Sequence, residues 1–383
     1  MNALHRRSFL KTSGLTILPT LFPFTNVIGG GHHKPGDERP VNFWGDGMMF
    51  NPSEYITKLQ EINTALPIKG DRYGAGGAVE ELEKKFVEIT GKEKAIYMPS
   101  GTMANQLAIK VLSGDNVKVF VQETSHVYRD EADAAQLVHD KRLIPLAKGE
   151  PYFTAEELDA SIAYHKSGEH FNTGIGAVSI EVPVRRNDGR MIPFEELKRV
   201  SAYCRKQNIK LHLDGARLYM ASAWSGVPIK EYASLFDTVY ISLYKYFGAS
   251  AGAILCGNAS VIEKMPNLIK VHGGSMYQNW VNAVIPLQVM KGFEERLLAA
   301  RKKGEELITR LNKLTQIKIN ALKDGTNIYE MKLTGIDMDK FVQSLAAANI
   351  RLPKNGTFSI NETLLNRDND ILFDAFKKGI AKA

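Results

Sequence analysis

The chain has 383 residues, of which 44% are hydrophobic, 24% charged and 9% aromatic. This composition is typical of a soluble globular protein, and it excludes disordered, collagen-like and disulfide-scaffold proteins. The formal net charge of +7 is spread along the chain, without the basic stripe or tail of a nucleic-acid binder. The two cysteines, Cys204 and Cys256, have apolar neighbours that predict buried thiols and no metal site, although a disulfide between them stays open.

The first segment, residues 1–33, resembles a bacterial export signal of the twin-arginine type. The run Arg6-Arg7-Ser8-Phe9-Leu10-Lys11 matches the recurrent core Arg-Arg-x-Phe-Leu-Lys, and a mildly apolar stretch follows it. We therefore expect an exported, periplasmic protein; the alternative is a cytoplasmic protein whose N-terminus is merely basic. Beyond this segment the sequence offers no run of 18 apolar residues, so we expect no membrane span in the mature chain.

Residues 34–76 are predicted to form an N-terminal arm, and residues 77–280 a large domain in which short β-branched runs alternate with amphipathic stretches. Such alternation predicts an α/β fold with a mostly parallel seven-stranded sheet flanked by helices. The predicted helices include Val79–Thr90, Met103–Leu112, Ala155–His165 and Pro193–Gln207. The predicted strands are Ala95–Met98, Val117–Gln122, Arg142–Leu146, Gly176–Glu181, Ile209–Asp214, Thr238–Leu243 and Gly252–Cys256.

The last predicted strand follows its predecessor after only about eight residues, which is too few for a helical crossover. We therefore expect this strand to be antiparallel, or at least irregularly connected. The final segment, residues 281–383, is predicted to begin with a long helix from Leu287 to Leu314, with Pro286 near its start. A smaller C-terminal α+β domain is expected to follow.

Polar motifs stand where predicted strands end, the edge at which ligands bind in open α/β sheets. Ser100-Gly101-Thr102 opens a helix, where free amides and the helix dipole stabilise an anion, although a plain cap and turn is the alternative. His126 follows the next strand, and as a lone histidine it could be a capping or surface residue.

Two charged residues end or follow apolar strands further along the chain. Asp214 ends one strand, and a buried carboxylate needs a cationic or protonated partner, for which Arg217 is the structural alternative. Lys245 follows the next strand; partial burial lowers the pKa of a lysine and makes it a nucleophilic amine, whereas a snorkelling surface lysine is the alternative. Taken together, the motifs match pyridoxal phosphate, which needs a lysine for its aldehyde, an acid for its pyridine nitrogen and amides for its phosphate.

At these residues the chain resembles the threonine aldolases of the β-eliminating lyase group, within fold type I of the pyridoxal phosphate enzymes. The resemblance runs from about Gly70 to Leu287. It is carried by Asp71-Arg72-Tyr73-Gly74, Pro99–Gln106, Ser125-His126, Leu211–Leu218 and Ser242–Gly248.

The resemblance implies that Lys245 binds the cofactor aldehyde, Asp214 bonds the pyridinium and His126 stacks on the ring. It also implies that Ser100, Gly101 and Thr102 hold the phosphate, with Arg217 and Ser242 beside the cofactor. The partners it implies are a small amino-acid substrate and a second copy of the chain, in a homodimer or homotetramer.

The substrate half of the site departs from the family. Gly45 stands where the family has a serine that helps bind the substrate carboxylate, and Phe358 stands about where it has a carboxylate-binding arginine. Glu181–Arg185 resembles the Glu-x-Pro-x-Arg segment of a threonine-aldolase-like subgroup, so Arg185 is our candidate clamp, by planar two-point bonding. Tyr73 is a candidate substrate or neighbouring-subunit contact.

The expected reaction is retro-aldol cleavage of a threonine-like β-hydroxy amino acid to glycine and an aldehyde, with His126, or a water that it holds, as the base. The catalytic residues expected are Lys245, His126 and Asp214. The alternatives are a pyridoxal phosphate-dependent β-eliminating lyase or transaminase, or a cofactor-binding protein with little catalysis.

Overall fold

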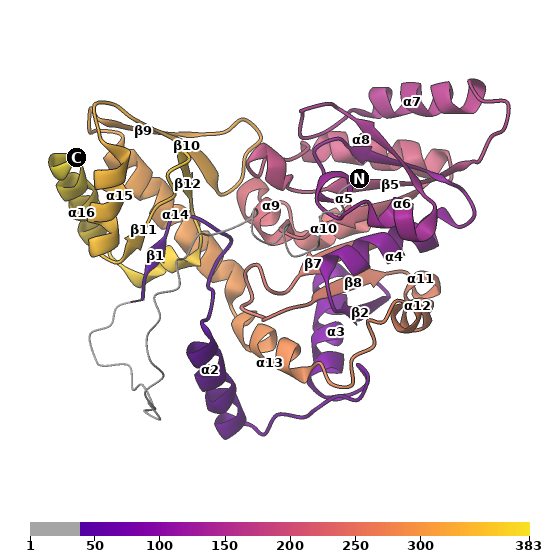
Figure 1. Ribbon diagram of the computed structural model, residues 1–383, viewed down its shortest axis with the longest axis horizontal. Coiled ribbons are helices and arrows are strands. Elements are labelled where there is room, and N and C mark those ends of the chain that lie inside the picture. The colour runs from indigo at the N-terminus through magenta and orange to yellow at the C-terminus, as the bar shows by residue number, and fades with distance from the viewer. Residues whose placement is uncertain (1–38) are drawn as a thin grey trace, which may run out of the picture. The chain divides into compact units, whose positions relative to one another are not determined.

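A computed structural model describes residues 39–383, and the expected export signal in residues 1–33 therefore lies outside the described residues. Within the described range the central element is a seven-stranded sheet with the order β2-β8-β7-β6-β5-β3-β4 (Figure 1). Its strands are β2 (Lys94–Met98), β3 (Lys118–Gln122), β4 (Arg142–Leu146), β5 (Ile175–Glu181), β6 (Lys210–Asp214), β7 (Thr238–Ser242) and β8 (Ala253–Gly257).

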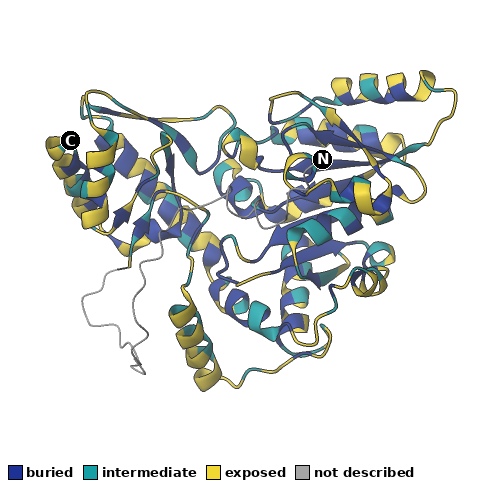
Figure 2. Ribbon diagram, in the orientation of Figure 1, coloured by how far each residue is buried: buried dark blue, intermediate teal, exposed yellow. Residues whose placement is uncertain are grey.

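The sheet confirms the predicted α/β class. Strands β4, β3, β5, β6 and β7 pair in parallel, while β8 pairs antiparallel with both β7 and β2, as its short connection requires. All residues of β3, β7 and β8 are buried, as expected for strands covered on both faces (Figure 2).

Helices cover the sheet on both faces. On one face α4 (Gly101–Ser113), α11 (Ala259–Ile262) and α12 (Met265–Val271) share an apolar cluster with Met98, Tyr240 and Leu255. The short helices α5 (His126–Arg129) and α6 (Ala134–His139) join α4 in a second cluster. The opposite face is covered by α3 (Gly77–Thr90), α7 (Ala155–Ser167), α8 (Phe194–Lys206), α9 (Leu218–Ser225) and α10 (Ile229–Ser234).

The single long helix predicted for Leu287–Leu314 is wrong. The structure has two helices instead, α13 (Trp280–Val289) and α14 (Phe293–Leu311), and Pro286 lies inside the first. Gly292, which precedes α14, has a φ of 66°, a left-handed conformation that interrupts the helical path and that glycine adopts without steric cost.

The C-terminal part has its own apolar core and two small sheets. Strands β9 (Ile317–Ala321), β10 (Ile328–Leu333) and β12 (Thr357–Ser359) form an antiparallel sheet in the order β12-β10-β9, and β1 (Val41–Asn42) of the N-terminal arm pairs with β11 (Ile350–Arg351). The core lies between these strands and the helices α14, α15 (Met338–Ala347) and α16 (Asn369–Lys382), with a 3₁₀ helix η2 (Glu362–Asn366) before the last.

The remaining helix, α2 (Pro52–Ala65), begins with a capping box in which Asn51 and Glu54 exchange hydrogen bonds, yet it buries none of its residues (Figure 2). Of the helices in residues 39–383, none combines the length and apolarity that a membrane crossing needs.

Candidate active site

Predicted site residues from the carboxyl ends of β2, β3, β6 and β7 meet at one small cavity. Its volume is about 110 Å³. Six of the predicted residues line it: Ser100, Gly101, Thr102, His126, Asp214 and Lys245. Because they come from the ends of different strands, the sheet order brings together residues that are up to 145 positions apart in the sequence.

Lys245 lies just beyond β7 in largely buried surroundings. Burial, and then the positive charge of Arg217, lower the pKa of its amine to about 8. The amine is therefore neutral in a larger fraction of molecules at neutral pH than an ordinary lysine, which is the state in which it attacks an aldehyde.

Asp214 is held by hydrogen bonds to both of its carboxylate oxygens. Asn105 Nδ2 donates to Oδ2 at 2.9 Å, and the Ala216 amide donates to Oδ1 at 3.1 Å. Asn105 Oδ1 in turn lies 2.9 Å from His212 Nε2, and burial lowers the pKa of His212 to about 4, so its neutral ring donates this hydrogen bond. The alternative interpretation of Asp214 as the partner of Arg217 in a structural salt bridge is wrong, because Arg217 makes two hydrogen bonds with Asp46 of the N-terminal arm.

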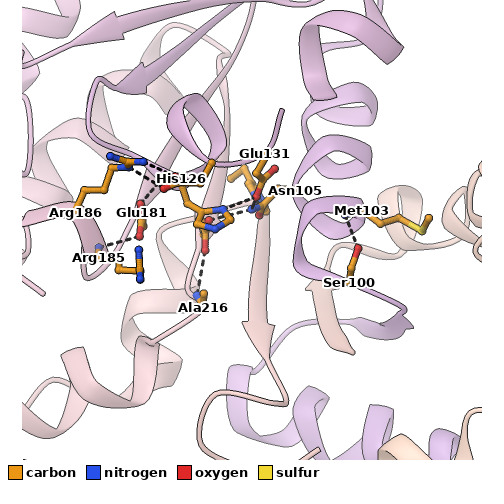
Figure 3. A network of polar contacts seen from close by, with 12 residues as sticks. Ser100, Met103, Asn105, His126, Glu131, Glu181, Arg185, Arg186 and Ala216 are labelled. Carbon is orange, nitrogen blue, oxygen red and sulfur yellow. Dashed lines mark hydrogen bonds and ion pairs between the residues drawn. The ribbon is translucent and has the colours of Figure 1, made fainter. Parts of the chain in front are cut away.

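His126 opens α5 and faces a buried acid. Its Nδ1 lies 2.9 Å from Glu131 Oε1, which also accepts a 2.7 Å hydrogen bond from Asn105 Nδ2 (Figure 3). The hydrogen bond with Glu131 raises the pKa of His126 against the opposing effect of burial, and burial raises the pKa of Glu131. One ligand atom from each of His126, Glu131 and Asp214 lies within 4.8 Å of the other two. The side-chain amide of Asn105 thus donates to two acids, Glu131, which pairs with His126, and Asp214, which is predicted to bond the cofactor.

The N-terminus of α4 provides donors for an anion. The Ser100 side chain caps the helix by accepting from the Met103 amide at 3.2 Å (Figure 3), whereas the amides of Gly101 and Thr102 belong to the first turn and have no helical acceptor. Only glycine fits at position 101, because an added Cβ would lie 2.1 Å from the Tyr240 hydroxyl.

These residues fit pyridoxal phosphate on chemical grounds. The cavity combines unpaired first-turn amides, a fixed carboxylate, an imidazole and an amine of lowered pKa, which are the groups required by its phosphate, ring nitrogen, ring face and aldehyde. Ser242 Oγ is also buried, beside the Tyr240 hydroxyl.

Four other predicted residues do not line the cavity: Arg185, Tyr73, Arg217 and Ser242. Arg185 is exposed in the 3₁₀ helix η1 (Arg185–Asn187), just beyond β5. Tyr73 is 55% exposed and packs edge-on against Tyr277, at 5.4 Å between ring centroids. Phe358 is buried in the core of the C-terminal part, stacked on Phe43 at 4.3 Å, so this position offers no polar group to a substrate.

Asn105, Glu131 and Asp46 also take part in the site, although the sequence did not predict a role for them. Asn105 could have been identified from the sequence, since it is a polar residue on the apolar, buried side of α4. Glu131 and Asp46 could not, because Glu131 reaches His126 only through the short turn after α5, and Asp46 meets Arg217 across 171 residues.

Comparison with known proteins agrees with this geometry. The model of the β-eliminating lyase family matches residues 55–334, more than half of the chain. The low-specificity L-threonine aldolase of Candida albicans is 33% identical over 55% of this chain, and the match spans 56% of that enzyme, just over half of its length. The Saccharomyces cerevisiae enzyme of the same name is 28% identical, over 73% of this chain and 72% of its own.

A solved structure points the same way. The protein from Listeria monocytogenes, assigned as an L-allo-threonine aldolase, is 25% identical and superposes with a TM-score of 0.71, over 89% of this chain and 97% of its own. The chain belongs to the β-eliminating lyase family, and it is a pyridoxal phosphate-dependent lyase of fold type I.

Proposed function

We propose that the protein cleaves a threonine-like β-hydroxy-α-amino acid to glycine and an aldehyde, with pyridoxal phosphate bound at Lys245. The observation that carries this proposal is the meeting of Lys245, Asp214 and the His126–Glu131 pair at one cavity. When bound, the cofactor supplies an electron sink for the charge left on Cα when a bond to that carbon breaks.

Asp214 has the environment of a group that keeps the ring nitrogen protonated. Its carboxylate is buried and fixed by Asn105 and the Ala216 amide, so it cannot rotate away from a cationic partner. A charge-assisted hydrogen bond of this kind is about twice as strong as a neutral one.

His126 is the proposed base for the proton of the β-hydroxyl group. Glu131 holds Nδ1, so Nε2 is the ring atom that remains to accept a proton, and the carboxylate stabilises the positive charge that the ring then carries. General-base assistance of this type contributes roughly 10²–10⁴-fold to rate.

Arg185 is the proposed clamp for the substrate carboxylate. Three arginines stand near the site, and two are already paired, Arg217 with Asp46 and Arg186 with Asp130. Within the described part of the chain, no ion pair or hydrogen bond engages the guanidinium of Arg185, and its backbone makes the hydrogen bonds of this residue, from its amide to Glu181 and to its carbonyl from the Asp188 amide. Because Gly45 and Phe358 offer nothing polar, this side chain is the cation best suited to that role.

Product analysis tests the proposed reaction. Purified protein loaded with pyridoxal phosphate is incubated separately with threonine, serine and cysteine. We expect glycine and acetaldehyde from threonine. Pyruvate and ammonia from serine or cysteine would indicate a β-eliminating lyase. Transfer of the amino group to an oxoacid would indicate a transaminase. Absence of any product would indicate a cofactor-binding protein with little catalysis.

Self-association is part of the proposal. Helix α2 buries none of its residues, and the exposed apolar side chains Ile56, Leu66, Met276 and Tyr277 support association of two or more copies. Light scattering should give at least a dimer, and a fully active monomer would contradict it.

Export is proposed from the sequence of residues 6–11 alone. A folded-protein route would let Lys245 bind the cofactor before export, and ligand bound to the native state adds stability. Cell fractionation should find the native chain outside the cytoplasm and an Arg6→Lys, Arg7→Lys variant retained inside it. Equal cytoplasmic retention of both chains would contradict export.

A further inference from the structure

One buried carboxylate, that of Glu181, contacts the backbone amides of both His126 and Arg185. Glu181 ends β5, directly opposite Asp214 in the strand register, and is 3% exposed. Its Oε2 accepts a 2.7 Å hydrogen bond from the His126 amide, and its Oε1 accepts a 3.0 Å hydrogen bond from the Arg185 amide (Figure 3).

The carboxylate is itself held in place. The Gln122 side chain brackets the Glu181 backbone, accepting from its amide at 2.8 Å and donating to its carbonyl at 2.9 Å. Gln122 also donates to the Pro151 carbonyl at 3.2 Å, which ties this strand end to the loop before α7. The end of β5 is therefore fixed on a neighbouring strand before its side chain reaches the site.

Burying this acid beside a second acid is electrostatically unfavourable. Burial, and then the charge of Asp214, raise the pKa of Glu181, whereas the two amides lower it. A buried acid is tolerated at such a place when its charged form is hydrogen-bonded. The charged groups that act on it are Asp214, His126, Arg186, Arg217 and Lys245.

We propose that Glu181 is a positioning residue that fixes the backbones of His126 and Arg185 relative to each other. The roles of these two residues rest on the proposed function, but the coupling between them does not. If the roles hold, Glu181 sets the distance between His126, the base for the proton of the β-hydroxyl group, and Arg185, the clamp for the substrate carboxylate. It thereby selects α-amino acids that carry a free carboxylate.

Hydrogen exchange in the protein without cofactor tests the coupling. Glu181→Met keeps the side-chain length and removes both acceptors, so peptides containing the amides of His126 and Arg185 should exchange roughly tenfold faster or more. Glu83→Met is the control: Glu83 is a partly buried acid with a raised pKa, and it accepts the Tyr97 amide at 2.8 Å outside the site. It should affect exchange at Tyr97 and leave the other two amides unchanged.

Unchanged exchange at either His126 or Arg185 in Glu181→Met would overturn the proposal. If that variant does not fold, Glu181→Gln replaces it; glutamine keeps one acceptor, so one of the two amides should lose protection, and loss at neither would overturn the proposal.

A binding measurement then tests the consequence for specificity. Titration of the bound-cofactor absorbance with glycine and with glycinamide should show that the folded Glu181 variant loses most of the preference for the free carboxylate, as Arg185→Ala should. An unchanged preference overturns the specificity role. The exchange experiment needs neither cofactor nor turnover, so failure of the proposed reaction is distinguishable from failure of the coupling.

Discussion

Replacing Asp214 by asparagine tests the electrostatic core of the site. The substitution keeps the shape of the side chain and removes its charge, and one of the two oxygens becomes an NH₂ group. Both oxygens currently accept hydrogen bonds, from Asn105 at 2.9 Å and from the Ala216 amide at 3.1 Å. One of these donors therefore loses its acceptor, which costs about 1–3 kcal/mol of folding free energy at a buried position.

The expected effect on activity is larger than the effect on the fold. Hydrogen bonds to charged groups contribute about 1.5–3 kcal/mol, and each 1.36 kcal/mol is a factor of ten in rate, so kcat should fall by roughly 10- to 150-fold. The assay is acetaldehyde release from threonine, with cofactor content measured by absorbance and folding by thermal denaturation.

Asp237→Asn is the matched control for this substitution. Asp237 accepts a hydrogen bond from the Leu211 amide at 2.9 Å and pairs with Lys210 at 3.1 Å. These contacts lie at the amino ends of β6 and β7, whereas Asp214 lies at the carboxyl end of β6. We expect Asp237→Asn to lower stability by a similar amount and to leave kcat unchanged. Wild-type kcat in Asp214→Asn with full cofactor content, or equal loss of kcat in both variants, would refute the electrostatic reasoning.

Three further predictions concern the clamp, the base and a partly buried acid outside the site. Arg185→Ala should raise KM for threonine by roughly 10- to 150-fold with little change in kcat; an unchanged KM in steady-state kinetics would remove Arg185 from substrate binding. Glu131→Gln should lower the pKa of His126, because the hydrogen bond with Glu131 raises it; the rise of kcat with pH should then shift to lower pH, and an unshifted profile would separate His126 from that rise. Burial raises the pKa of Glu83 to about 7, so its contribution to stability is present below its ordinary value of 4.5 and is lost as pH rises through 7. Relative to Glu83→Gln, the wild type should therefore lose about 3 kcal/mol of unfolding free energy between pH 4.5 and 8 in urea titrations, and parallel curves would contradict this.

The central strands of the sheet were predictable from sequence because they are buried on both faces. A strand such as β7, predicted as Thr238–Leu243 and observed as Thr238–Ser242, is a continuous apolar run bounded by polar residues. The same property made Asp214 and Lys245 recognisable, since a charged residue at the end of such a run stands out from its neighbours.

Long-range polar pairing was not predictable in the same way. The charge of Asp214 suggested Arg217 as its partner, three residues away, but Arg217 turns to Asp46 of the N-terminal arm, and the neutral amide of Asn105 serves Asp214 instead. No periodicity encodes a contact between side chains 109 or 171 residues apart. The break between α13 and α14 was missed because one glycine at position 292 outweighs an otherwise continuous helical pattern.

The central claim is that these strand ends form a pyridoxal phosphate site centred on Lys245. It is tested most directly by incubating the protein with the cofactor, reducing with borohydride and locating the modified residue by peptide mapping. We predict a single modified peptide that carries the cofactor on Lys245, and none in Lys245→Ala. Modification at another lysine, or equal modification of the Lys245→Ala variant, would contradict the account.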